Sequence, residues 1–154
     1  MRAAMRLRVE TTIAAPPGAV WAHLEDIATH TEWMADATSI DFLTDQRRGA
    51  GTRFACRTQV GPLRTTDLME ITEWSPPSRM GVRHTGAVSG EGRFELTAAG
   101  PAGESTRMVW LETLRLPWWL GGRLGALPAR PVLRRVWRGN LARLKARVES
   151  GAGP

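Results

Sequence analysis

The chain has 154 residues, of which 42% are hydrophobic and 23% are charged, a composition typical of one globular domain. We therefore expect a single domain over residues 1–154, with an ordered core at about 6–149. No apolar run approaches the roughly 20 residues of a membrane-spanning helix, and residues 1–8 lack the continuous apolar centre of a signal peptide. The single cysteine, Cys56, excludes an internal disulfide, so the expected compartment is cytoplasmic.

The net charge of +6 is concentrated near the C-terminus. Nine Arg or Lys residues and no acidic residue lie between Arg115 and Arg147, whereas the rest of the chain holds twelve bases and fifteen acids. Such a basic surface can attract nucleic acid, anionic lipid or an acidic partner, but a solvated helix face explains it more simply. Aromatic residues are not interleaved with the basic face, so stacking platforms are missing and we expect no nucleic-acid partner.

The chain opens with one strand and two short helices. Polar and apolar residues alternate over residues 6–13, a pattern that predicts the strand. Pro16 and Pro17 then open a helix predicted over residues 18–25. Asp26 is placed to cap a second short helix that runs through Trp33 and Met34.

From residue 36 onward, short β-type segments are separated by turn residues. We predict strands over residues 38–44, 52–60, 63–74, 79–86, 90–97 and 106–115. The connections are tight and rich in Gly and Pro, which predicts an antiparallel meander.

The last regular segment is a helix predicted from about Pro128 to Glu149. Its apolar residues recur at intervals of three and four, which places them on one side of the helix and the arginines on the other. The apolar stripe consists of Leu133, Val136, Trp137, Leu141, Leu144 and Val148. Because nearly everything upstream is strand, we expect this stripe to lie on a curved sheet, with a pocket between the helix and the sheet.

Three segments carry a family resemblance: TTIAAPPGAVWAHLEDIATHTEW at 11–33, ITEWSPPSRMGVRH at 71–84 and NLARLKARVE at 140–149. They resemble the START-related helix-grip superfamily (SRPBCC), and most closely its polyketide cyclase/dehydrase and lipid-transport branch. The resemblance covers roughly residues 7–149 and implies an α+β fold of the order β-α-α-β6-α. In that fold a seven-stranded curved antiparallel sheet wraps around a long C-terminal helix. The superfamily includes carriers, cyclases and hydrolases, so the resemblance is specific for fold and weak for activity.

Alternation along each strand identifies the side chains that are expected to face the pocket. On five strands these are Phe54, Cys56, Asp67, Met69, Val82, His84, Phe94, Trp110 and Glu112. The expected ligand-binding set also contains Trp33, Trp118, Trp137 and Asn140. Asn140 interrupts the apolar stripe of the terminal helix, and its amide either points at a ligand or bonds the backbone in a packing role. Cys56 has no Cys or His neighbour in the sequence, so we interpret it as a small buried hydrophobe.

Three of these residues, Asp67, His84 and Glu112, are ionisable and lie on otherwise apolar strand faces. An unpaired buried charge is costly, so each is expected to be paired, hydrogen-bonded or shifted in pKa. Two interpretations stay open. Either these are catalytic residues that share acid and base roles, or one or more of them lies near a strand end and reaches water or an arginine such as Arg57 or Arg83.

The segment at 114–127 (LRLPWWLGGRLGAL) concentrates large apolar residues around a proline and a pair of glycines. Tryptophan suits the rim of a pocket or a membrane interface, and paired glycines give a gate its backbone freedom. The segment is therefore a gate, a plug for the open end of the sheet, or a surface for transient contact with an anionic membrane. The residues that carry these alternatives are Trp118, Trp119, Gly121 and Gly122, with Arg115, Arg123 and Arg130 around them.

These features favour a binding or carrier protein for a hydrophobic or aromatic small molecule, lipid-like or polyketide-like, held between the sheet and the terminal helix. The alternative is a polyketide cyclase or dehydratase that uses acid–base residues in the same pocket. His23, His30 and His84 show no metal-ligand spacing, and the sequence lacks phosphate-loop and nucleophile-elbow motifs, so we expect neither a metal nor a cofactor. We expect a monomer or a homodimer.

Overall fold

The computed structural model describes residues 4–154, apart from the side chains at positions 122, 123, 125 and 126. Its elements in chain order are β1 (Met5–Ile13), α1 (Pro17–Leu24), the 3-10 helix η1 (Ile27–Glu32), β2 (Ala37–Phe42), β3 (Arg53–Val60), β4 (Leu63–Ser75), β5 (Arg79–Gly86), β6 (Ser89–Ala99), β7 (Ser105–Arg115), the 3-10 helix η2 (Trp118–Leu120) and α2 (Gly122–Glu149). The strand boundaries agree with the predicted ones to within two residues.

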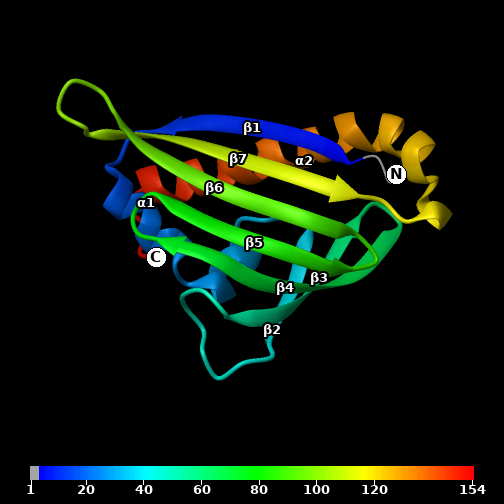
Figure 1. Ribbon diagram of the computed structural model, residues 1–154. Helices are drawn as coiled ribbons and strands as arrows, with labels where there is room; N and C mark the ends of the chain where they lie inside the picture. Colours follow the sequence, from blue (N-terminus) through cyan, green and yellow to red (C-terminus); the bar gives the residue numbers. More distant parts are fainter. Residues whose placement is uncertain (1–3) are drawn as a thin grey trace.

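The seven strands form one antiparallel sheet in the order β1-β7-β6-β5-β4-β3-β2. Strands β2 to β7 pair as a meander, and β1 pairs with β7 at the other edge. Figure 1 shows α2 lying across one face of the curved sheet, from η2 at one end to α1 at the other. This arrangement is the helix-grip fold, so the predicted α+β class and the β-α-α-β6-α order are confirmed.

Strand β4 contains one bulge, and the residue after it packs against α1. The register with β5 shifts between Ile71 and Glu73, so Ile71 and Trp74 both pack against the interior. A bulge of this kind changes the side to which the following residues point. Trp74 thereby meets Trp21 of α1 edge to face, with ring centroids 5.2 Å apart.

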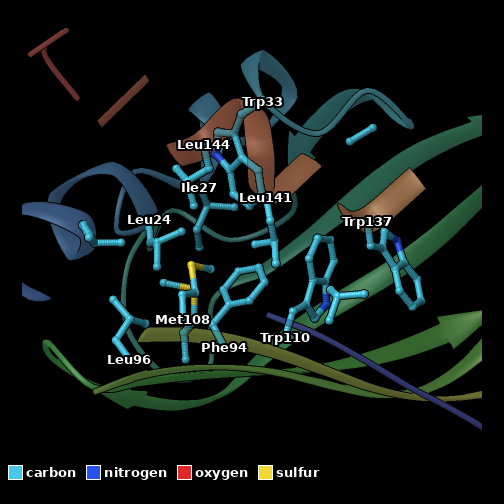
Figure 2. Close-up of a cluster of buried hydrophobic side chains, with 14 of the residues drawn as sticks. Leu24, Ile27, Trp33, Phe94, Leu96, Met108, Trp110, Trp137, Leu141 and Leu144 are labelled. Atoms are coloured by element: carbon cyan, nitrogen blue, oxygen red, sulfur yellow. The ribbon is translucent and has the colours of Figure 1, made fainter. Parts of the chain in front are cut away.

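The C-terminal half of α2 completes a densely packed core. Leu141 and Leu144 lie fully buried between helix and sheet, among the residues shown in Figure 2. Trp137, one turn earlier, stacks on Trp110 of β7 with 5.2 Å between centroids and 26° between planes. Trp110 and Trp137 belong to the core and also line a cavity beside the N-terminal half of α2.

The terminal helix begins earlier than predicted. α2 starts at Gly122 instead of Pro128, and Pro128 and Pro131 both lie inside it. An interior proline removes one backbone hydrogen bond, which is why the sequence favoured a start at Pro128. Gly121 precedes the helix with a left-handed backbone at φ +85°, a conformation that glycine adopts without steric cost. The segment at 114–127 therefore contains η2 and the first turns of α2 and is not one continuous loop.

The second short helix also differs from its prediction. η1 is a 3-10 helix that ends at Glu32, so Trp33 and Met34 lie beyond it. Asp26 occupies the N-cap, but its side chain makes no capping hydrogen bond. The backbone carbonyl of Asp26 instead accepts hydrogen bonds from the N–H and the hydroxyl of Thr29.

Candidate functional site

A cavity of about 480 Å³ lies between the concave face of the sheet and the N-terminal half of α2. Its sheet side includes Phe54, Cys56, Thr58 and Val60 of β3 and Leu63, Thr65, Asp67, Met69 and Ile71 of β4. Its helix side consists of Pro128, Ala129, Val132, Leu133 and Trp137. Both the size and the mainly apolar wall are typical of small-molecule sites, which measure roughly 300–1,000 Å³.

Asp67, His84 and Glu112 are ionisable side chains within this apolar wall. Asp67 of β4 and Glu112 of β7 are buried, and the side chain of His84 on β5 is only 13% exposed. The pairing of β4, β5, β6 and β7 brings the three residues together on one concave surface. We refer to Asp67, His84 and Glu112 as the polar cluster.

Glu112 is held in place by residues on two strands. The indole N–H of Trp110 donates a hydrogen bond to Glu112 Oε1 at 2.8 Å. Glu112 Oε2 lies 3.3 Å from His84 Nε2, without the alignment of a full hydrogen bond. To reach β5 the carboxylate crosses β6 at Gly92, its register partner, where a Cβ would lie 2.3 Å from Oε1. A strand glycine here supplies the room that the carboxylate occupies.

His84 lines the cavity beside Glu112. Burial alone would lower the pKa of His84, but the contact with Glu112 and the charge of Asp67 outweigh it and raise the pKa above its ordinary value. Nε2 is the ring nitrogen that faces Glu112, so Nδ1 is the ring nitrogen that Glu112 does not occupy. An imidazole held in this way can anchor a ligand or move a proton.

Asp67 has a different environment. Burial raises the pKa of Asp67, and this effect is partly offset by the backbone N–H of Val88, by the charge of His84 and by the Thr65 hydroxyl. The Val88 N–H donates to Oδ1 at 3.3 Å, and Thr65 donates to Oδ2 at 3.4 Å. These partners take the place of the arginine or solvent contacts that the sequence left open as an alternative.

Most of the residues predicted to bind ligand form the cavity wall. They are Phe54, Cys56, Asp67, Met69, Val82, His84, Phe94, Trp110, Glu112 and Trp137. Cys56 is buried, and burial raises the pKa of its thiol to about 11, which suits a small hydrophobe better than a nucleophile. Contact between these residues and a ligand stays a prediction.

Trp33 belongs to the core and does not line the cavity. It is 1% exposed, and its ring lies 6.1 Å from Phe94 and 6.3 Å from Trp110, measured between centroids. Because Phe94 and Trp110 do line the cavity, Trp33 supports two wall residues from the core side. The predicted ligand contact of Trp33 is therefore corrected to a supporting role.

Asn140 also lies outside the cavity wall. Its Oδ1 accepts hydrogen bonds from the backbone N–H of Ala35, at 3.0 Å, and from the guanidinium of Arg143. Its Nδ2 donates to Asp36 Oδ1 at 2.7 Å. Of the two predicted alternatives for Asn140, the structure has the packing role, in which a fully buried amide ties α2 to the segment after η1.

An exposed apolar surface adjoins the cavity at the start of α2. Trp118, Trp119, Leu124 and Leu127 are 86%, 52%, 79% and 74% exposed, and we call these four residues the mouth patch. Leu120 and Pro128, which lie within and directly after this stretch of the chain, line the cavity. Trp118 thus points away from the predicted ligand site, and exposed indoles do not plug the end of the sheet. The side chain of Arg123 lies outside the described residues.

The sequence interpretation missed His30, Asp36 and Gly92. His30 and Asp36 line the cavity, and His30 Nε2 donates to the carbonyl of Leu24 at 2.8 Å. Burial lowers the pKa of His30 to about 4, so its ring is neutral near pH 7. The spacing of three between Ile27 and His30 was the signal for His30, and alternating glycines at 90 and 92 were the signal for Gly92.

Within residues 4–154 as described, no group of three or more His, Cys, Asp or Glu side chains could hold a metal ion. None of the helices described for this chain is long and apolar enough to cross a membrane.

A curved sheet that grips a helix around an apolar cavity defines a START-like protein of the SRPBCC superfamily. The chain belongs to the polyketide cyclase/dehydrase and lipid transport family, whose sequence profile matches residues 4–149. The predicted resemblance is thereby confirmed. A comparison with curated protein sequences finds no match.

Solved structures show the same fold. The crystal structure of TTHA0849 from Thermus thermophilus is 24% identical, covers 97% of this chain and 100% of its own, and has a TM-score of 0.80. A START superfamily protein from Mycobacterium smegmatis is 11% identical over 96% of this chain and 99% of its own, with a TM-score of 0.78. The Zhui aromatase/cyclase from Streptomyces sp. R1128 is 19% identical over 95% of this chain and 94% of its own, with a TM-score of 0.75.

Proposed function

We propose that the protein binds a hydrophobic or aromatic small molecule, lipid-like or polyketide-like, and carries it in the cavity between the sheet and α2. The observation that supports this proposal most is the apolar cavity of about 480 Å³. Protein interiors are normally packed to the density of organic crystals, and an empty apolar space forfeits dispersion contacts. A ligand of matching shape restores those contacts, so binding is the simplest use of the cavity. The cytoplasm remains the compartment that we propose for this carrier.

Native mass spectrometry of the freshly purified protein tests the proposal, because a co-purified molecule appears as added mass. Met69→Trp places a large ring in the cavity and should abolish that added mass. Leu68→Trp is the matched control, since Leu68 is 42% exposed on the other side of the same strand. Equal ligand retention by both variants would contradict binding in this cavity.

A second candidate function is a polyketide cyclase or dehydratase, and the polar cluster favours it. His84 lies 3.3 Å from Glu112 inside an apolar cavity, where proton transfer to a bound carbonyl compound meets little competition from water. Turnover of a polyketide-like substrate should then collapse in His84→Gln, Asp67→Asn and Glu112→Gln, tested one at a time, while ligand binding persists. A carrier without catalysis shows no turnover in the unmodified protein.

We also propose that the mouth patch makes transient contact with an anionic membrane. Trp118 and Leu124 are strongly exposed beside the cavity, and Arg130 adds positive charge in the next turns of α2. Aromatic side chains at the interface and arginines near lipid headgroups are the usual components of such contacts. Contact at this place would let an apolar ligand move between bilayer and cavity with little exposure to water.

A further inference from the structure

The polar cluster has a charge balance that bears on ligand chemistry. Asp67 and Glu112 are acidic residues, and the His84 imidazole beside them can carry one positive charge. Asp36 adds a third carboxylate to the wall, where it accepts a hydrogen bond from Asn140. Arg93 also reaches the wall, but its side chain is 43% exposed and its guanidinium pairs with Glu95 at 2.7 Å. The described cavity wall therefore holds three carboxyl side chains and one arginine, and that arginine is already paired with Glu95.

Glu112 lies beside one ring nitrogen of His84, which leaves the other ring nitrogen for a ligand. The carboxylate is fixed from one side by the Trp110 indole N–H and passes through the space above Gly92 to His84 Nε2. A fixed carboxylate at one ring nitrogen sets the orientation of an imidazole and favours its protonated form. In the protonated ring Nδ1 also carries a proton and is a charged donor that Glu112 does not occupy.

On these grounds we propose that His84 Nδ1–H is the polar anchor of the cavity and that it selects apolar ligands with one uncharged acceptor oxygen, such as a ketone, over ligand carboxylates. This inference rests on the proposed binding function. A ketone oxygen accepts the hydrogen bond without bringing a charge into an apolar space. A ligand carboxylate loses its own hydration and meets Asp67 and Glu112, which already offset the charge of His84.

Three naphthalene compounds test the carrier function and the His84 anchor separately. The probes are 2-ethylnaphthalene, 2-acetylnaphthalene and 2-naphthoate, and dissociation constants are measured at pH 7 by displacement of a fluorescent apolar dye. We expect the ethyl compound to bind, the acetyl compound to bind about tenfold more tightly, and the naphthoate to bind more weakly than the acetyl compound. The ethyl compound alone tests whether the cavity takes apolar molecules.

His84→Phe removes the anchor and should cancel the tenfold advantage of the ketone while leaving the ethyl compound unchanged. Thr58→Val is the control, because it removes a different polar group from the same cavity and should keep the advantage. Should His84→Phe fail to fold, nitrogen NMR of the unmodified protein replaces it. The Nδ1 resonance of His84 should then move with the acetyl compound and stay in place with the ethyl compound.

The outcomes are distinct. Binding of the ethyl compound without a ketone advantage, a ketone advantage that survives His84→Phe, or naphthoate that binds as tightly as the ketone would each overturn the anchor and leave the carrier function standing. Failure of all three compounds to bind would overturn the carrier function, and the anchor with it.

Discussion

Glu112 and Gly92 are partners on neighbouring strands, and the carboxylate of the first occupies the space that a side chain on the second would need. A Cβ at position 92 would lie 2.3 Å from Oε1 and 2.7 Å from Oε2. Glycine within a strand ordinarily weakens it, because the residue gains no packing and loses backbone entropy. Here that cost is offset by a buried carboxylate that bridges β7 and β5.

Gly92→Ala should therefore lower the free energy of unfolding by about 2–4 kcal/mol. The added methyl displaces Glu112, which leaves the Trp110 indole N–H and a buried carboxylate without their partners. Urea unfolding followed by tryptophan fluorescence measures the change. Gly18→Ala in α1 is the control, because nothing lies within 4 Å of a Cβ there and the free energy should stay constant or rise slightly. Equal effects of the two substitutions would show that Glu112 does not need the space.

Glu112→Gln should lower the pKa of His84. The raised pKa of His84 depends on contact with Glu112 and on the charge of Asp67, both of which act against burial. Without the Glu112 carboxylate, less opposes the lowering of the His84 pKa by burial, so the imidazole loses its proton at lower pH. A proton NMR titration of the His84 ring measures the midpoint. Glu95→Gln, on the outer face of β6, is the control that should leave this midpoint in place.

The same shift has a consequence for stability. The folded protein holds the His84 proton more tightly than the unfolded chain does, so protonation of His84 stabilises the fold. This contribution to the free energy of unfolding is fully present below the unfolded pKa near 6.5. It is lost as the pH rises through the raised pKa of the folded state. Glu112→Gln should flatten this decline in the free energy of unfolding, and an unchanged slope above pH 7 would contradict the coupling of His84 to Glu112.

His30 should destabilise the protein in acid. Its pKa is lowered to about 4, mainly by burial, whereas the unfolded residue titrates near 6.5. Between these values the unfolded chain takes up a proton that the folded protein refuses, so stability falls as the pH drops. We expect a loss of about 2–3 kcal/mol between pH 7.5 and pH 4.5. His30→Gln removes this titration, and urea unfolding at the two pH values should show a smaller loss for the variant.

The pocket-facing side of the strands could be predicted from the sequence because alternation is a local property. Cys56, Met69, Val82 and Trp110 all face the cavity as expected, since a single slipped residue would have turned an apolar set to water. The one bulge in β4 falls after Ile71 and so leaves the cavity-facing part of the strand unaffected.

The remaining features depend on contacts between distant segments. Asn140 reads as a polar interruption of an apolar stripe, and only the fold shows that Ala35 and Asp36 lie within reach of its amide. Gly92 has no visible purpose until Glu112 on another strand is placed beside it. The early start of α2 was hidden by Pro128, which is a helix breaker by local rules but is accommodated inside this helix.

We expect the protein to bind anionic vesicles through the mouth patch. Transfer of exposed indole and leucine side chains into the lipid interface stabilises the bound state, and nearby arginines add an attraction that salt screens. Trp118→Ala combined with Trp119→Ala should weaken binding to phosphatidylserine-containing vesicles by about tenfold or more in a sedimentation assay at low salt. Added salt should weaken binding of the unmodified protein as well.

Leu43→Ala is the control for this vesicle experiment. Leu43 is also exposed, at 54%, but it belongs to the loop after β2, which Figure 1 shows far from the start of α2. Its removal lowers the exposed apolar area without touching the mouth patch, so vesicle binding should persist. Equal losses in the Leu43 and tryptophan variants would indicate unspecific adsorption. An absence of binding at low salt would eliminate the membrane contact, because screening is then weakest and the arginines attract anionic lipid most strongly.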